Sequence, residues 1–368
     1  MLGAVEAVLA RKSHMTVNRY TFLDGVRGIA AIFVFTRHAS DFWGWRPYRS
    51  YLAVDLFFLL SGFVIAYAYD ERLRNKKMST RQFLLTRLIR LYPMFLLSVI
   101  VSSLVVIGKS AMGAQEHIPV GEMLGVFALT ALFLPAKMQG NVQLFPLNGP
   151  YWSLFYELVA NALYALLLPV LNTYVLACIV AASLAAVCFG AVLHGNLDMG
   201  LYWGLASNAA GFFRSTFGIF LGLLIYRNTE FLTRYLGGRV SPWYGVIGMA
   251  LVLATPMLPR FNAQMDLLAV AVILPVCLIL ASQDRPSRMD SVFLVLGAVS
   301  YPIYVLHVPI IAIISLAIAG RMAYHPPLGG AILLAGIVAL SVWIVKVYDL
   351  PARRWLSRKI LKKRSQQA

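Results

Sequence analysis

The stretch Tyr51–Tyr69, YLAVDLFFLLSGFVIAYAY, decides the class of fold. Asp55 is its only charged residue, and a helix needs roughly 20 such apolar residues to cross the hydrocarbon of a bilayer. Similar runs recur at about 22–42, 51–69, 83–107, 150–171, 174–193, 203–226, 242–258, 266–282, 292–316 and 327–346. The sequence therefore predicts an all-α, polytopic membrane helix bundle of about ten transmembrane helices. Residues 120–135 are too short and interrupted to assign, so spanning, re-entrant and interfacial placements stay open.

The composition excludes a soluble protein. Of 368 residues, 60% are hydrophobic and 13% are charged, against about 25% charged in soluble domains. Disorder and a disulfide scaffold are excluded as well. The three cysteines, Cys178, Cys188 and Cys277, lie inside apolar runs and are interpreted as small buried hydrophobes.

The distribution of basic residues predicts the topology. The chain has 32 Lys and Arg against 15 Asp and Glu, a net charge of +17, yet no nucleic-acid partner is expected because these residues fall between the apolar runs. With the N-terminus inside, 21 of the 32 lie on the inner side and 6 on the outer side. Both termini are then cytoplasmic, and the protein is expected in the cell (inner) membrane. We expect a cytoplasmic segment 1–20, a transmembrane domain 21–348 and a basic, lipid-facing tail 349–368, with the start at Met1 or Met15 left open.

Charged residues inside membrane spans are costly, so each is a functional candidate. Arg27 and His38 share one span, and their spacing returns to within about 20° of the same face after a rise of about 16 Å. Arg87 and Arg90 form an i, i+3 pair near the cytoplasmic end of the third run, where like charges repel unless an anion lies between them. Pro93 is expected to kink that helix and open space beside the pair.

The other candidates are Asp55, Glu157 and His307, expected in the outer half, and Arg214, near the middle of its span. Structural alternatives exist for most of the set. The arginine pair can be membrane anchors, His38 can be a structural residue bonded to a backbone carbonyl, and His307 can be structural. Asp55 can orient His38 or pair with Arg37. Arg214 can be the counter-charge of a buried acid. Ser61-Gly62-Phe63 is typical of a small-residue helix contact.

The candidates favour group transfer across the membrane. A histidine suits removal of a hydroxyl proton near neutral pH, and a neighbouring carboxylate would fix its tautomer. A phosphate-bearing donor would be held by the inner arginines. The sequence shows no nucleophile elbow, metal-ligand spacing or nucleotide-binding glycine pattern, so direct transfer without a metal or resident cofactor is expected. The alternative is a proton-coupled transporter or flippase of an anionic or lipid-linked sugar.

Five motifs lie between about residue 20 and residue 350. They are Leu23-Asp24-Gly25-Val26-Arg27-Gly28-Ile29-Ala30-Ala31 followed by His38, Asp55-Leu56-Phe57-Phe58-Leu59-Leu60-Ser61-Gly62-Phe63, Arg87-Leu88-Ile89-Arg90 with Tyr92-Pro93, Trp152-Ser153-Leu154 with Glu157, and Ser300-Tyr301-Pro302-Ile303-Tyr304-Val305-Leu306-His307. Together they resemble the acyltransferase-3 family of membrane O-acyltransferases. Each motif alone is weak, but five in this order are specific.

The resemblance implies an acyl-CoA co-substrate, usually acetyl-CoA, and a hydroxyl acceptor that is commonly a carbohydrate. It also implies that His38 is the catalytic base and that Arg27, Arg87 and Arg90 bind the donor. Asp55 and Glu157 complete the expected catalytic group. Possible substrate-binding or supporting residues are Trp152, Tyr301, His307 and Arg214. The acceptor, the acyl group and the oligomeric state are not specified by the sequence.

Overall fold

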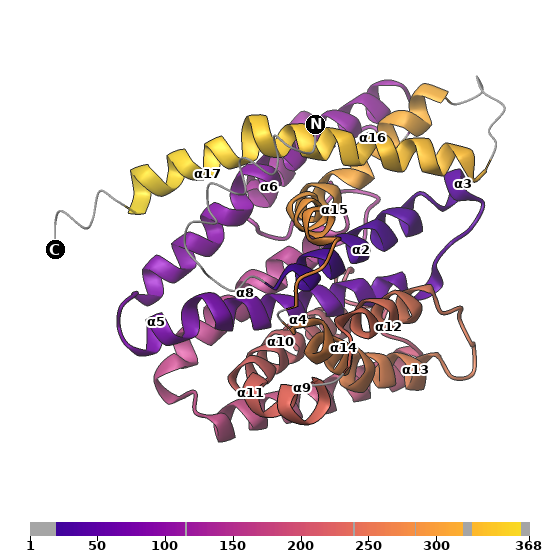
Figure 1. Ribbon diagram of the computed structural model, residues 1–368. Coiled ribbons are helices and arrows are strands. Elements are labelled where there is room, and N and C mark those ends of the chain that lie inside the picture. The colour runs from indigo at the N-terminus through magenta and orange to yellow at the C-terminus, as the bar shows by residue number, and fades with distance from the viewer. Residues whose placement is uncertain (1–19, 115, 238–239, 284, 319–325, 362–368) are drawn as a thin grey trace.

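The computed structural model describes residues 20–114, 116–237, 240–283, 285–318 and 326–361, and these residues form a helix bundle without strands (Figure 1). The predicted all-α membrane class is thereby confirmed. Its helices are α2 (Thr21–His38), α3 (Ser40–Trp43), α4 (Ala53–Ile65), α5 (Glu71–Arg74), α6 (Thr80–Ala111), α7 (Val120–Ala131), α8 (Tyr151–Leu167), α9 (Thr173–His194), α10 (Leu205–Arg227), α11 (Thr229–Leu232), α12 (Pro242–Ala254), α13 (Asn262–Leu268), α14 (Leu274–Ala281), α15 (Asp290–Ile318), α16 (Leu328–Ile344) and α17 (Leu350–Leu356).

Short 3₁₀ or π turns join several helices end to end. Eight continuous helical stretches in the described residues are long and apolar enough to cross a membrane. They are Tyr48–Arg74, Thr80–Ala111, Tyr151–Val170, Thr173–His194, Leu205–Arg227, Asn262–Ala281, Asp290–Ile318 and Leu328–Leu361. Each coincides with one of the runs predicted from the sequence.

Two of the ten predicted spans do not meet this criterion. Helix α2 has 18 residues but carries Asp24, Arg27 and Arg37, and α12 has 13 residues, about 20 Å of helix. Both nevertheless belong to the bundle, because α2 packs along α15 and α12 packs against α14 and α2. Helix α7, in the unassigned segment, has 12 residues and is about 18 Å long. That length is too short for a straight crossing of about 30 Å of hydrocarbon.

The ends of the chain are only partly described. Residues 1–19 and 362–368 lie outside the described ranges, so most of the predicted N-terminal segment and the end of the basic tail do too. The rest of the tail continues the last span as helix to Leu361, and the structure has no break at residue 349. This long helix lies beside α6 (Figure 1).

Glycines bring α4 and α10 into backbone contact. A Cβ atom added at Gly62 would lie 1.9 Å from the carbonyl oxygen of Ile219, and one at Gly222 would lie 2.1 Å from that of Leu59. Such approach is possible only without a side chain, as in the small-residue contacts of membrane helices. The small-residue contact predicted at 61–63 is therefore present. It holds the second half of α4 against α10.

Candidate active site

Two histidines from distant parts of the chain meet beside a pocket. His38 is the last residue of α2, and its Nδ1 lies 2.9 Å from the carbonyl oxygen of Val34 and 3.2 Å from Nε2 of His307. The two rings are edge to face, with centroids 4.7 Å apart. His307 is fully buried in α15, with its Nδ1 3.1 Å from the carbonyl oxygen of Ile303. Each histidine thus bonds a carbonyl, which the structural alternative predicted for His38, and the two also bond each other.

These contacts fix the protons of a neutral histidine pair. A carbonyl oxygen can only accept, so Nδ1–H of His307 donates to Ile303 and its Nε2 is left as an acceptor. Nδ1 of His38 faces two acceptors, the Val34 carbonyl and that Nε2, so it carries the hydrogen. The lone pair of His38 is then on Nε2, which has no hydrogen bond to any described residue. This is the tautomer that a general base requires.

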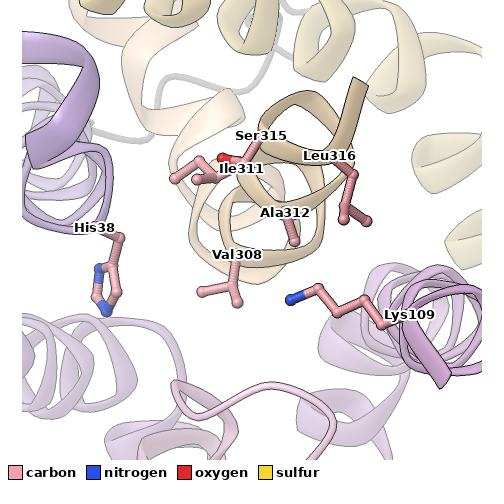
Figure 2. A pocket seen from close by; sticks show the side chains of 7 residues that line it. All are labelled: His38, Lys109, Val308, Ile311, Ala312, Ser315 and Leu316. Carbon is pink, nitrogen blue, oxygen red and sulfur yellow. The ribbon is translucent and has the colours of Figure 1, made fainter. Parts of the chain in front are cut away.

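The pocket has a volume of about 380 Å³, within the range of small-ligand sites. Figure 2 shows His38 and Lys109 at opposite sides, with side chains of α15 between them. Its lining residues are His38, Lys109, Val308, Ile311, Ala312, Ser315 and Leu316. On the predicted topology the end of α2, the end of α6 and the second half of α15 all lie in the outer half of the membrane. On that topology the pocket therefore lies in the outer half of the bundle.

A proline in α15 frees a backbone carbonyl that bonds two other parts of the chain beside the pocket. Pro309 has no N–H, so the carbonyl of Val305, four residues earlier, loses its usual helical donor. That oxygen accepts instead from Oγ of Ser98 on α6 and from Nδ2 of Asn148, 2.8 Å away, in the segment before α8. Two further parts of the chain are thereby attached to the turn that carries His307.

Asp55 does not contact His38. Its carboxylate accepts from Nε and Nη2 of Arg214 at 2.9 and 2.6 Å, and the two residues are 7% and 2% exposed. Arg214 also donates to the carbonyl of Met199, and its guanidinium lies 5.2 Å from the ring centroid of Trp152. The expectation that Asp55 orients His38 is therefore not met. Because α4 and α10 touch, the carboxylate reaches the arginine, which is the counter-charge alternative for Arg214.

Arg37 likewise does not pair with Asp55. It donates to Oδ2 of Asp198 at 2.6 Å and to the carbonyl of Tyr48 at 2.7 Å. The loop between α9 and α10 supplies the acid, and that loop was not a candidate from the sequence.

Glu157 supplies a counter-anion for Arg87, one of the two arginines on α6. Its Oε1 lies 2.6 Å from Nη2 of Arg87 and 2.6 Å from Oγ of Ser61. Arg87 is only 4% exposed, so it is not an anchor that reaches the headgroups. Arg90 is half-buried, and no described carboxylate lies within ion-pair distance of its guanidinium. The sequence predicted open space for an anion beside both arginines. Beside Arg87 this space is filled by the carboxylate of Glu157.

Two further candidates lie apart from these groups. Arg27 is half-buried, with Nη1 3.8 Å from Oδ1 of Asp24 one turn earlier. Tyr301 donates its hydroxyl to the carbonyl of Leu91 at 2.8 Å. The structure thus brings together His38 with His307, Asp55 with Arg214 and Trp152, and Glu157 with Arg87, but it does not join these three groups into one constellation. Across the described residues, no three His, Cys, Asp or Glu side chains are grouped as metal ligands.

Lys109 was not among the candidates predicted from the sequence. The apolar run was expected to end at residue 107, which left Lys109 as a loop cation, but α6 continues to Ala111 and carries it along the pocket. The run of polar and small residues 108–111 has no Pro and ends before Gly113, which was the available signal for a longer helix.

This fold and site define a multi-pass membrane protein with a histidine pair suited to proton transfer. The model of the acyltransferase domain family known as acyltransferase-3 matches residues 20–346, and the chain belongs to this family. It is therefore an acyltransferase that moves groups other than aminoacyl groups. A relative from Rhizobium radiobacter, "Protein 2 in picA locus", is 44% identical over 156 residues, which are 40% of this chain and 81% of the relative. No solved structure matches the chain.

Proposed function

We propose that the protein is an O-acyltransferase of the cell inner membrane, with His38 as general base. It transfers an acyl group, in the first instance acetyl, from acyl-CoA to a hydroxyl of a carbohydrate or other small acceptor. One observation carries the proposal: the bond between His38 and His307 leaves the lone pair of His38 on Nε2, at the wall of a pocket of about 380 Å³.

The proposed step is a direct transfer. Nε2 of His38 takes the proton of the acceptor hydroxyl as its oxygen attacks the thioester carbonyl carbon. The tetrahedral intermediate collapses with cleavage of the C–S bond, and the imidazolium returns its proton to the thiolate. The products are the O-acyl ester and free CoA. His307 acts as a positioning residue, because its Nε2, together with the Val34 carbonyl, holds the hydrogen of His38 on Nδ1.

The donor is proposed to bind from the cytoplasmic side. Arg27 and Arg90 are half-buried on the predicted inner halves of α2 and α6, where they can bind the phosphates of CoA. Arg87 is already paired with Glu157, so we give it the role of fixing α6 against α8 at this level. Its part in donor binding is then indirect.

The test is acetyl transfer by purified protein in a detergent without hydroxyl groups. With acetyl-CoA as donor and an alkyl glucoside as acceptor, the assay measures release of free thiol and formation of the acetyl ester. His38→Ala should lower kcat by about 10²- to 10⁴-fold, the contribution of a positioned base. His117→Ala is the matched control, because His117 is exposed and does not line the pocket.

His307→Phe separates the positioning role from a packing role. It removes one of the two acceptors of the His38 Nδ1–H and leaves the Val34 carbonyl in place. We therefore expect kcat to fall less than in His38→Ala, with a shifted pH profile of kcat and a KM for acetyl-CoA that stays near normal. Full turnover by folded His38→Ala protein would overturn the proposal.

A further inference from the structure

Lys109 is a cation of the pocket that no described acid neutralises. It is half-buried in the last turn of α6, and no described carboxylate lies within ion-pair distance of it. Two arginines on the same predicted side pair with acids: Arg37 with Asp198, and Arg49 with Asp266. The two other described arginines on that side, Arg46 and Arg260, are exposed. Lys109 differs from both groups, because it is half-buried at the pocket and no described acid pairs with it.

The direction of the Lys109 side chain distinguishes a pocket ligand from a lysine that reaches the lipid headgroups. A lysine near the end of a membrane helix can extend to the lipid headgroups. Figure 2 instead shows the Lys109 amine directed across the pocket, toward the side on which His38 lies. The wall between them is apolar, formed by Val308, Ile311 and Ala312, with Ser315 as its hydroxyl group. An ammonium beside apolar walls is stabilised by a bound anion, since little water competes for it.

We propose that this pocket selects acceptors that carry an anionic group, a carboxylate or a phosphate. The anion binds the amine of Lys109, the apolar face of the acceptor lies on α15, and the reacting hydroxyl is presented to His38. The hydroxyl part of this inference rests on the proposed function, whereas anion binding by Lys109 does not.

The experiment compares three probes that share one alkyl chain: an alkyl β-glucoside, the corresponding glucuronide and the glucoside 6-phosphate. The readout is the ratio of kcat/KM for each charged probe to that for the neutral one. A charge-assisted hydrogen bond supports a preference of about 10- to 100-fold for at least one charged probe. The preferred probe tells a carboxylate from a phosphate. Lys109→Met should bring the ratio close to one, and Lys109→Arg should keep most of it.

Lys137→Met is the matched control. Lys137 is an exposed lysine on the predicted outer side that lies 5.4 Å from the ring centroid of Trp203 and does not line the pocket. Its ratio should equal that of the unmodified protein. Thermal unfolding of each variant, measured in the same detergent, establishes that the fold is intact.

A binding measurement without acetyl-CoA separates this inference from the proposed function. If the charged probe binds the protein, loses binding in Lys109→Met and is never acetylated, the inference stands and the transferase mechanism falls. If acetylation proceeds with the same probe ratio in Lys109→Met as in the unmodified protein, the anion-selective pocket is refuted while the transferase mechanism survives.

Discussion

The buried pair of Asp55 and Arg214 gives the sharpest quantitative prediction. Arg214→Met would leave the carboxylate of Asp55 without both of its guanidinium hydrogen bonds, at 2.9 and 2.6 Å, in a site only 7% exposed. Breaking a buried ion pair by removing one partner costs about 3–5 kcal/mol. Asp55→Leu should cost a similar amount, because it strands a guanidinium that is 2% exposed. The double variant removes both charges and should lose only about 1–2 kcal/mol, since well-packed apolar pairs often replace such ion pairs.

The free energy of unfolding can be measured by titrating an anionic detergent into neutral micelles that hold the purified protein. The coupling energy between the two positions should be at least about 2 kcal/mol. Losses that add to within about 0.5 kcal/mol would refute the pair as a structural unit. Acetyl transfer by the double variant then decides the role of Asp55. We expect most activity to return with stability, because Asp55 bonds Arg214 and does not contact His38. A stable but inactive double variant would restore the catalytic role predicted from the sequence.

Two further predictions concern packing and donor binding. Gly222→Val should sharply reduce the folded, monodisperse fraction in size-exclusion chromatography, because a Cβ at this position would lie 2.1 Å from the backbone of α4. Gly336→Val is the control, because a Cβ there meets nothing within 4 Å. Equal folded fractions for the two variants would contradict this prediction. Arg90→Gln should raise the KM for acetyl-CoA about tenfold with little change in thermal stability, as expected for loss of a charge-assisted hydrogen bond. Arg87→Gln should mainly lower thermal stability, because it leaves the carboxylate of Glu157 without its ion-pair partner. If Arg87→Gln instead raises the KM for acetyl-CoA and Arg90→Gln lowers stability, Arg87 is the donor ligand.

The sequence predicted the features that depend on local composition. Apolar runs of sufficient length locate helices, so eight predicted spans coincide with eight helical stretches of the described chain. The spacing of Arg27 and His38 likewise depends only on helix geometry. The shortness of α12 and the extension of α6 past Lys109 were missed, since helix ends respond to neighbouring segments as well as to propensity.

Pairing between helices could not be predicted from the sequence. Which acid meets which arginine depends on the rotation and crossing of helices far apart in the chain, and these are set by packing contacts such as Gly62 against Ile219. The sequence-based prediction that a carboxylate orients His38 was chemically reasonable. The structure instead uses Asp55 for Arg214 and gives His38 a second imidazole, His307.

The buried ion pairs have a consequence for biosynthesis. Arg214, the partner of Asp55, follows it in the chain after 159 residues, and Asp266 follows its partner Arg49 after 217 residues. At about 5–20 residues per second, a ribosome needs roughly 8–30 s to make the first of these intervals. During that time the early spans carry uncompensated charge, so they must be sheltered by the insertion machinery or by water at its mouth. A nascent chain stopped before residue 214 should therefore remain bound to the translocon, and release into lipid should follow synthesis of α10.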